Sequence, residues 1–228
     1  MVRFSADLRA AAEPLDGPFC SGLAEAARRT GIAVVAGVFE PAGEGLVYNT
    51  AVAFDAAGDL AAAYRKIHLF DALGQRESQT VAAGSTAVIA NLAGLRVGIL
   101  TCYDVRFPEL ARTLALRGAD LLVIGSAWAA GLFKEEHWVT LVRARAIENT
   151  IWVAAAGQVP DPDEPATAAP TGVGRSMLVD PMGTVRLDLG SQAAIGAGTV
   201  DTETTKQVRH VLPGLANRRP DAYFGSDD

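Results

Sequence analysis

The stretch that decides the fold is Gly98–Leu110, "GILTCYDVRFPEL". An apolar run of strand length ends here in Cys102, and a helix is predicted to start at Pro108, because proline favours the first helical position. Binding sites in open α/β sheets lie at the carboxyl ends of strands, so the thiol of Cys102 is predicted to face a cleft. A lone cysteine is more often a small buried apolar residue, so the motif's surroundings must decide between the two readings.

Strands and helices alternate along the rest of the chain. Four continuous apolar runs, typical of strands buried on both faces, span residues 32–38, 95–100, 120–126 and 151–157. Helices are predicted over residues 19–30, 108–117 and 134–149, and hairpin turns at residues 55–59 and 180–183. The proline-rich residues 160–174 are predicted as a loop. We expect one α/β domain over residues 1–228, with mixed sheets and an extended tail from about residue 213.

Composition excludes several classes of function. The net charge is −6 and the basic residues are scattered, so neither a nucleic acid nor an anionic membrane is expected as a partner. No apolar run reaches the roughly 20 residues of a membrane helix, and the first residues do not read as a secretory signal. The two cysteines, Cys20 and Cys102, do not suggest a disulfide framework. We therefore expect a cytoplasmic protein.

Three charged residues could serve a nucleophilic Cys102. Lys66 ends the second strand of the first predicted hairpin and could supply the cation that favours a thiolate. Glu77, in the loop that follows, could orient Lys66 or assist proton transfer. Each of the two would ordinarily be a solvated surface charge. Arg106 could hold the loop after the nucleophile or meet a substrate carboxylate, or it could form a structural ion pair with Asp104 or Glu109.

Four motifs carry a resemblance to a known family: "YRKIHLFD" at residue 64, "GILTCYDVRFPEL" at 98, "SAW..G..K..HW" at 126 and "RARAIENT" at 143. Together they resemble the nitrilase superfamily of carbon–nitrogen hydrolases, and most closely its amidase branch that includes the ω-amidases. The similarity extends to "AEPLDGPF", "VYNTAVAF" and "GRSMLVDPMG", and so covers nearly the whole chain in the family's order. Any one of these motifs is weak evidence, whereas the ordered set is specific.

The resemblance implies a four-layer αββα sandwich and a Glu–Lys–Cys triad. Cys102 would attack the carbonyl carbon of a small amide, and Lys66 and the backbone N–H of Tyr103 would stabilise the oxyanion. Ammonia would leave, and water would hydrolyse the thioester. Glu77 matches an additional glutamate of the family, and Trp128 matches a position that lines the pocket. No metal or organic cofactor is implied, and the histidines lack the spacing of metal ligands.

The resemblance also implies a homodimer and a small-molecule amide as substrate, either a linear amide or an ω-monoamide of a dicarboxylic acid. The family's general-base glutamate belongs to an N-terminal β-α-β unit that would precede Met1, so we expect this unit to be missing and the complete enzyme to be longer. A different reading is a non-catalytic nitrilase-fold subunit that dimerises or binds a ligand. Hydrolysis of an N-carbamoyl compound or of a nitrile is a further alternative.

Overall fold

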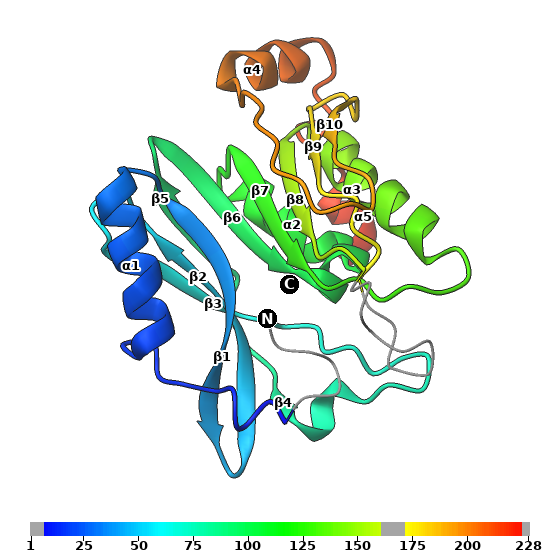
Figure 1. Cartoon of the computed structure of the whole chain (residues 1–228). Helices are drawn as coiled ribbons and strands as arrows, with labels where there is room; N and C mark the ends of the chain where they lie inside the picture. The colour runs from blue at the N-terminus through cyan, green and yellow to red at the C-terminus, as the bar shows by residue number, and fades with distance from the viewer. Residues whose placement is uncertain (1–6, 161–171, 225–228) are drawn as a thin grey trace.

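Two β-sheets pack face to face in the computed structural model, which describes residues 7–160 and 172–224. The first sheet has the order β1-β2-β3, with a short fourth strand paired to β2 (Figure 1). Its strands are antiparallel except for the β2–β4 pair. Their bounds are Val34–Gly43 for β1, Leu46–Phe54 for β2, Leu60–Arg65 for β3 and Val81–Ala82 for β4.

The second sheet has six strands in the order β10-β9-β8-β7-β6-β5. The central strands β6, β7 and β8 are parallel, and the outer pairs are antiparallel, so the sheet is mixed as predicted. The carboxyl ends of the three central strands therefore lie at one edge. The bounds are Ile89–Leu92 for β5, Leu95–Thr101 for β6, Leu121–Ser126 for β7, Trp152–Gly157 for β8, Met177–Val179 for β9 and Val185–Asp188 for β10.

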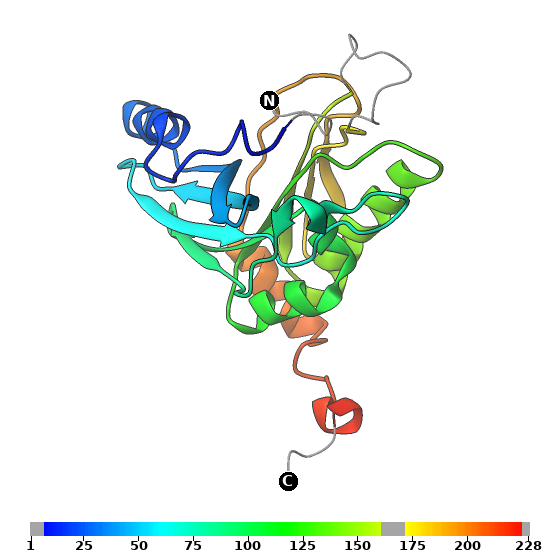
Figure 2. The same ribbon diagram turned by 90° about the horizontal axis from the view of Figure 1, so that it is seen from below.

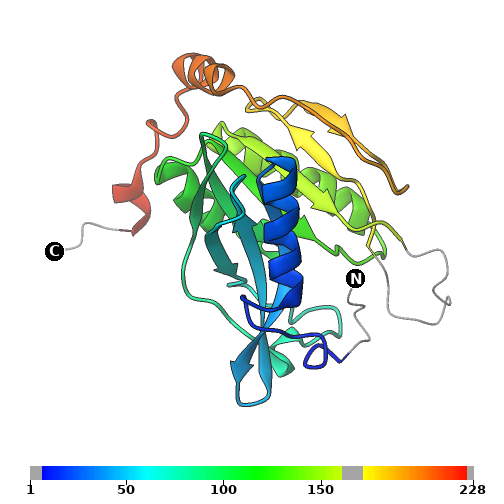
Figure 3. The same ribbon diagram turned by 60° about the vertical axis from the view of Figure 1, so that its left-hand side comes forward.

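Helices cover the outer faces of both sheets (Figures 2 and 3). Helix α1 (Pro18–Thr30) lies on the first sheet, where its buried Cys20 and Ala27 pack against β1 and β2. Helices α2 (Pro108–Leu116) and α3 (Lys134–Asn149) lie on the second sheet. Apolar side chains from both sheets form one continuous core between these layers. The expected α/β sandwich is confirmed.

Short-range features of the sequence predicted several elements correctly. Helix α1 ends at Gly31, which adopts a φ of 68° and donates its N–H to the carbonyl of Ala27, as a glycine cap does. Helix α3 covers the predicted range. The turn of the β2–β3 hairpin is held by Asp55, and that of the β9–β10 hairpin by Asp180, each carboxylate accepting two backbone N–H groups.

Three features differ from the expectations. Strand β1 is not buried on both faces, and the preceding Ile32 is 62% exposed, because within the described ranges β1 pairs with β2 alone. Helix α4 (Thr202–Val211), capped by Asp201, was not predicted. The tail is not wholly extended, because α5 (Pro220–Phe224) forms within it and projects from the body (Figure 2).

The loop predicted at residues 160–174 lies mostly outside the described residues. Within the described ranges every helix is too short or too polar to cross a lipid bilayer.

Candidate active site

Cys102 sits on a strained turn at the carboxyl end of β6. It is the first residue of a 3-10 helix, η2 (Cys102–Arg106), and its φ is +50°. A non-glycine residue rarely adopts this left-handed conformation, and such residues cluster at functional sites because the surrounding structure must hold them there. The residue is partly exposed. The turn therefore places Cys102 at the carboxyl end of β6, where it is partly exposed and also packs against the edge of the core.

A buried carboxylate fixes this turn. Asp104 is fully buried and accepts hydrogen bonds from the phenol of Tyr64 at 2.7 Å and from the backbone N–H of Thr101 at 2.9 Å. It also accepts from the backbone N–H of His68 at 3.1 Å, and the Nδ1 of His68 lies 2.8 Å from it. Burial, together with the negative charge of Asp104, raises the pKa of Tyr64, so the phenol remains a donor.

Lys66 and Glu77 form an ion pair in the adjoining segment. Lys66 directly follows β3 and is 2% exposed. Its ammonium donates to Oε2 of Glu77, which also accepts the backbone N–H of Phe70 at 2.6 Å. The other oxygen of Glu77 accepts from the side-chain amide of Asn49 at 3.2 Å. The carboxylate is thus held by three groups, and it fixes where the ammonium points.

Aromatic side chains surround the turn that carries Cys102. The ring of Tyr103 meets Phe70 edge-on at 5.0 Å between centroids, and it meets Phe107 in the same way at 5.2 Å. The ring of Phe107 stacks on that of His68 at 3.7 Å. These contacts join η2 to the segment after Lys66, and such pairs are worth about 0.5–1.5 kcal/mol each beyond the area that they bury.

Trp128 and Arg106 lie against each other. Trp128 follows β7, is 2% exposed, and donates its indole N–H to the carbonyl of Lys134 at 2.7 Å. The guanidinium carbon of Arg106 is 4.9 Å from the centroid of the Trp128 ring, and its Nη2 lies 3.2 Å from Nδ1 of His137. Since a guanidinium can only donate, that ring nitrogen accepts.

Neither ion pair that we considered for Arg106 forms. The carboxylate of Asp104 is occupied by Tyr64, His68 and Thr101, and no salt bridge joins Arg106 to Glu109 within the described residues. The guanidinium therefore has no carboxylate partner in this part of the chain.

Lys134 is a residue of this site that sequence reasoning missed. It is the first residue of α3 and is only 5% exposed. Its ammonium lies 4.1 Å from the centroid of the Trp128 ring and 5.2 Å from that of Phe70. The signal was present, since Lys134 is the lysine of the motif quoted at Ser126–Trp138. A lysine at a helix start is ordinarily solvated, so its burial was not foreseen.

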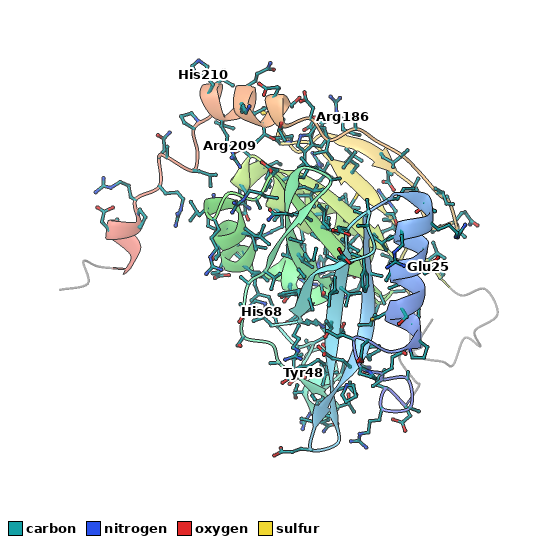
Figure 4. The ribbon with its side chains drawn as sticks, turned by 90° about the vertical axis from the view of Figure 1, so that its left-hand side faces the viewer. Glu25, Tyr48, His68, Arg186, Arg209 and His210 are labelled. Atoms are coloured by element: carbon teal, nitrogen blue, oxygen red, sulfur yellow. The ribbon has the colours of Figure 1, made fainter. Side chains whose placement is uncertain are left out.

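Other titratable residues are engaged elsewhere. Glu13, which we did not assign a catalytic role, accepts the backbone N–H of Phe19 at 3.1 Å near the start of α1. His68 contacts Asp104. His210 lies on α4, well apart from His68 (Figure 4).

A pocket of about 430 Å³ lies at the carboxyl end of β8. It is lined by Gly157, Gln158 and Ser176, and by residues of the segment after β10. None of the predicted site residues lines it, so it is separate from the cleft that we expected beside Cys102.

These groups are suited to nucleophilic attack on a carbonyl carbon. A thiol on a strained turn is a candidate nucleophile, and a buried ammonium can stabilise negative charge that develops on oxygen. The Asp104 contacts tie the segments of Cys102 and Lys66 together.

Comparison with known proteins gives a consistent family. The carbon–nitrogen hydrolase family model matches residues 1–210. A hydrolase of Mycobacterium tuberculosis is 42% identical over 226 residues, covering 96% of this chain and 80% of the relative. The deaminated glutathione amidase of Escherichia coli O157:H7 is 38% identical over 209 residues (91% and 76%). The omega-amidase of Homo sapiens is 34% identical over 217 residues (93% and 77%).

Solved structures agree with this result. A carbon–nitrogen hydrolase superfamily protein of Xanthomonas campestris, with an arsenic adduct in its active site, superposes with a TM-score of 0.82 at 28% identity, covering 95% of this chain and 80% of that one. A mutant amidase from Nesterenkonia, whose active-site cysteine had covalently added the acetamide moiety of fluoroacetamide, gives a TM-score of 0.72 at 27% identity (90% and 71%).

Proposed function

The chain belongs to the carbon–nitrogen hydrolase family, and from this premise we propose that it hydrolyses a small linear amide, or an ω-monoamide of a dicarboxylic acid, through a thioester on Cys102. Relatives named as amidases support hydrolysis of an amide carbon–nitrogen bond. The observation that carries the proposal is the positive φ of Cys102, which presents a thiol at the end of β6 next to the segment that holds the Lys66–Glu77 pair.

The first step forms the carbon–sulfur bond. The sulfur of Cys102 attacks the amide carbonyl carbon, and the electron pair of the C=O bond moves to oxygen. The ammonium of Lys66 and the backbone N–H of Tyr103 stabilise this oxyanion. Each such donor is worth roughly 10²–10³-fold in rate. Glu77 is a positioning residue, since it holds the Lys66 ammonium in place.

The second step breaks the carbon–nitrogen bond. The oxyanion collapses, the nitrogen leaves as ammonia with the proton that the thiol gave up, and a thioester remains on Cys102. Water then attacks the thioester, releases the carboxylic acid and restores the thiol. The sum is one amide and one water converted to one acid and one ammonia. Trp128 and Arg106 would contact the acyl group, the former as part of the pocket wall.

Ammonia release and intact-protein mass test this proposal together. Purified protein is offered succinamate and propanamide, and also N-carbamoyl-β-alanine and propionitrile for the two alternative reactions. Cys102→Ala should abolish release, whereas Cys20→Ala, at the other cysteine, should leave it unchanged. Rapid quenching should show a mass increase equal to the acyl group, lost in Cys102→Ala. Unchanged turnover in Cys102→Ala would contradict the assignment, and ligand binding without ammonia would favour the non-catalytic alternative.

The homodimer that the resemblance implies remains a prediction, and light scattering on the purified protein would test it.

A further inference from the structure

Lys134 is a buried cation that packs against two aromatic rings. Its side chain is 5% exposed, yet within the described residues its ammonium has no carboxylate partner and no hydrogen-bond acceptor. The other buried cations differ, because Lys66 pairs with Glu77 and Arg145 with Glu148. Burying an unpaired charge is costly, and contacts with two aromatic rings offset only part of that cost. A cation left in this state is suited to receive an anion from outside the chain.

A second cation lies beside it. The indole of Trp128 contacts both charges, with the Lys134 ammonium 4.1 Å and the Arg106 guanidinium carbon 4.9 Å from its centroid. Burial lowers the pKa of Lys134, and the charge of Arg106 lowers it further. The Phe70 ring lies 5.2 Å from the Lys134 ammonium and 5.0 Å from the ring of Tyr103. Tyr103 directly follows Cys102 in the chain. The two cations and the candidate nucleophile thus share one site.

The nearby carboxylates do not neutralise this pair. Asp104 is occupied by Tyr64 and His68, and Glu77 is occupied by Lys66. No hydrogen bond joins the Lys134 ammonium to the Cys102 sulfur in the described structure, so the lysine is not paired with the thiol either. Among residues 7–160 and 172–224, the site therefore holds two positive charges that no carboxylate matches.

We propose that Lys134, together with Arg106, anchors the carboxylate of the substrate, so that the enzyme acts on short amides that carry a carboxylate in preference to neutral amides of the same shape. This inference rests on the proposed amide hydrolysis and adds Lys134 as a residue that determines specificity. A carboxylate seated between the two cations would make charge-assisted hydrogen bonds to both. The bond to Lys134 would be the stronger one, because that side chain is largely shielded from water. The amide at its other end would reach Cys102.

Two amides of matched shape test the proposal. Succinamate carries a carboxylate, and 4-methylpentanamide carries an isopropyl group in its place. The wild-type enzyme should prefer succinamate. In Lys134→Met, kcat/KM for succinamate should fall roughly 10- to 100-fold, mostly through KM, because a buried charge-assisted bond is lost. The value for 4-methylpentanamide should change less than about twofold, since uniform binding of the acyl chain is untouched. Lys134→Arg should recover most of the succinamate activity.

Lys206→Met is the matched control, because Lys206 lies on α4 with its side chain 70% exposed. This variant should leave kcat/KM unchanged for both amides. Circular dichroism and thermal unfolding of each variant would establish that it is folded. An equal fall in kcat/KM for both amides in Lys134→Met would overturn the proposed anchor and point instead to activation of the thiol. An unchanged kcat/KM for succinamate would also overturn it.

A binding measurement separates this inference from the reaction itself. Succinate has no amide to hydrolyse. It should slow the alkylation of Cys102 by iodoacetamide in the wild-type protein, and it should not slow this alkylation in Lys134→Met. Protection without turnover of any amide would retain the anchor and reject the proposed function. Turnover of both amides at equal efficiency, without protection by succinate, would reject the anchor and retain the function.

Discussion

The phenol of Tyr64 donates a 2.7 Å hydrogen bond to the buried carboxylate of Asp104. Tyr64 lies on β3, two residues before Lys66, and Asp104 lies on η2, two residues after Cys102. The bond thus joins the two sheets at the point where each delivers one of the candidate catalytic side chains. Together with the aromatic contacts around η2, this carboxylate sets the relative position of the segments that carry the thiol and the ammonium.

Asp104→Asn should therefore lower both stability and activity. The new amide group would point a donor at groups that already donate, leaving buried donors unsatisfied at a cost of about 1–3 kcal/mol. Urea unfolding would measure the stability loss, and ammonia release would measure the effect on Cys102. Asp59→Asn, at an exposed turn residue, is the control and should change neither. A fully active and stable Asp104→Asn protein would contradict this role.

Glu77→Gln should leave the Lys66 ammonium buried without its counter-charge. The expected loss of stability is about 3 kcal/mol, the lower end for a buried pair because the Glu77 side chain keeps 17% exposure. The rate of ammonia release should fall at least roughly tenfold, because the Lys66 ammonium is no longer held in position. Glu203→Gln breaks the exposed Lys206–Glu203 pair and should cost less than about 1 kcal/mol. Equal losses of stability in the two variants would show that the buried Lys66–Glu77 pair contributes no more than the exposed Lys206–Glu203 pair.

Lys134→Met should unfold at higher urea concentration than the wild-type protein, because it removes an unpaired buried charge. The gain should depend on pH. Since the folded-state pKa of Lys134 is lowered, mainly by burial, the folded protein binds this proton less tightly than the unfolded chain. The cost of the charge is full below the lowered pKa and disappears as pH rises past the ordinary lysine value of 10.5. Unfolding curves at about pH 7 and about pH 10.5 should show the gain shrinking. A gain independent of pH would contradict the explanation.

Gly84→Ala should disturb the end of β3. A Cβ at Gly84 would lie 2.1 Å from the carbonyl oxygen of Arg65, and the Gly84 N–H donates to the Lys66 carbonyl at 2.8 Å. The backbone must shift where Lys66 begins, so stability should fall by about 1–3 kcal/mol and ammonia release should fall with it. Gly22→Ala, inside α1 with nothing near the new Cβ, should instead add about 0.5–1 kcal/mol. Thermal unfolding of both variants checks the opposite signs.

Much of the fold could be predicted because its signals are local. Gly31 ends α1 through its own backbone freedom, and Asp55 and Asp180 close their turns through contacts within four residues. The exposure of β1 could not be predicted, because it depends on which strands pair beside it. Helix α4 was missed because its sequence is largely polar, so the apolar periodicity is weak.

The candidate site divides in the same way. The order of motifs along the chain identified Cys102, Lys66 and Glu77, and the contact between Lys66 and Glu77 agrees with one of the roles suggested for Glu77, that of orienting the lysine. Of the roles considered for Arg106, the ion pair with Asp104 is not formed, since that carboxylate binds Tyr64 and His68. Contact of Arg106 with a substrate carboxylate stays a prediction.

Residue order and short-range chemistry are enough to predict the alternation of strands and helices, the family and the candidate nucleophile. Which charges are neutralised depends on tertiary packing. Lys134 and Lys66 are both lysines at the boundary of an element, and their neighbours along the chain do not show which of them will be paired. In the described structure Lys66 pairs with a carboxylate, whereas Lys134 packs against Trp128 and has no carboxylate partner. The electrostatic state of a buried group is set by neighbours that are distant in sequence, so it appears only when the chain is folded.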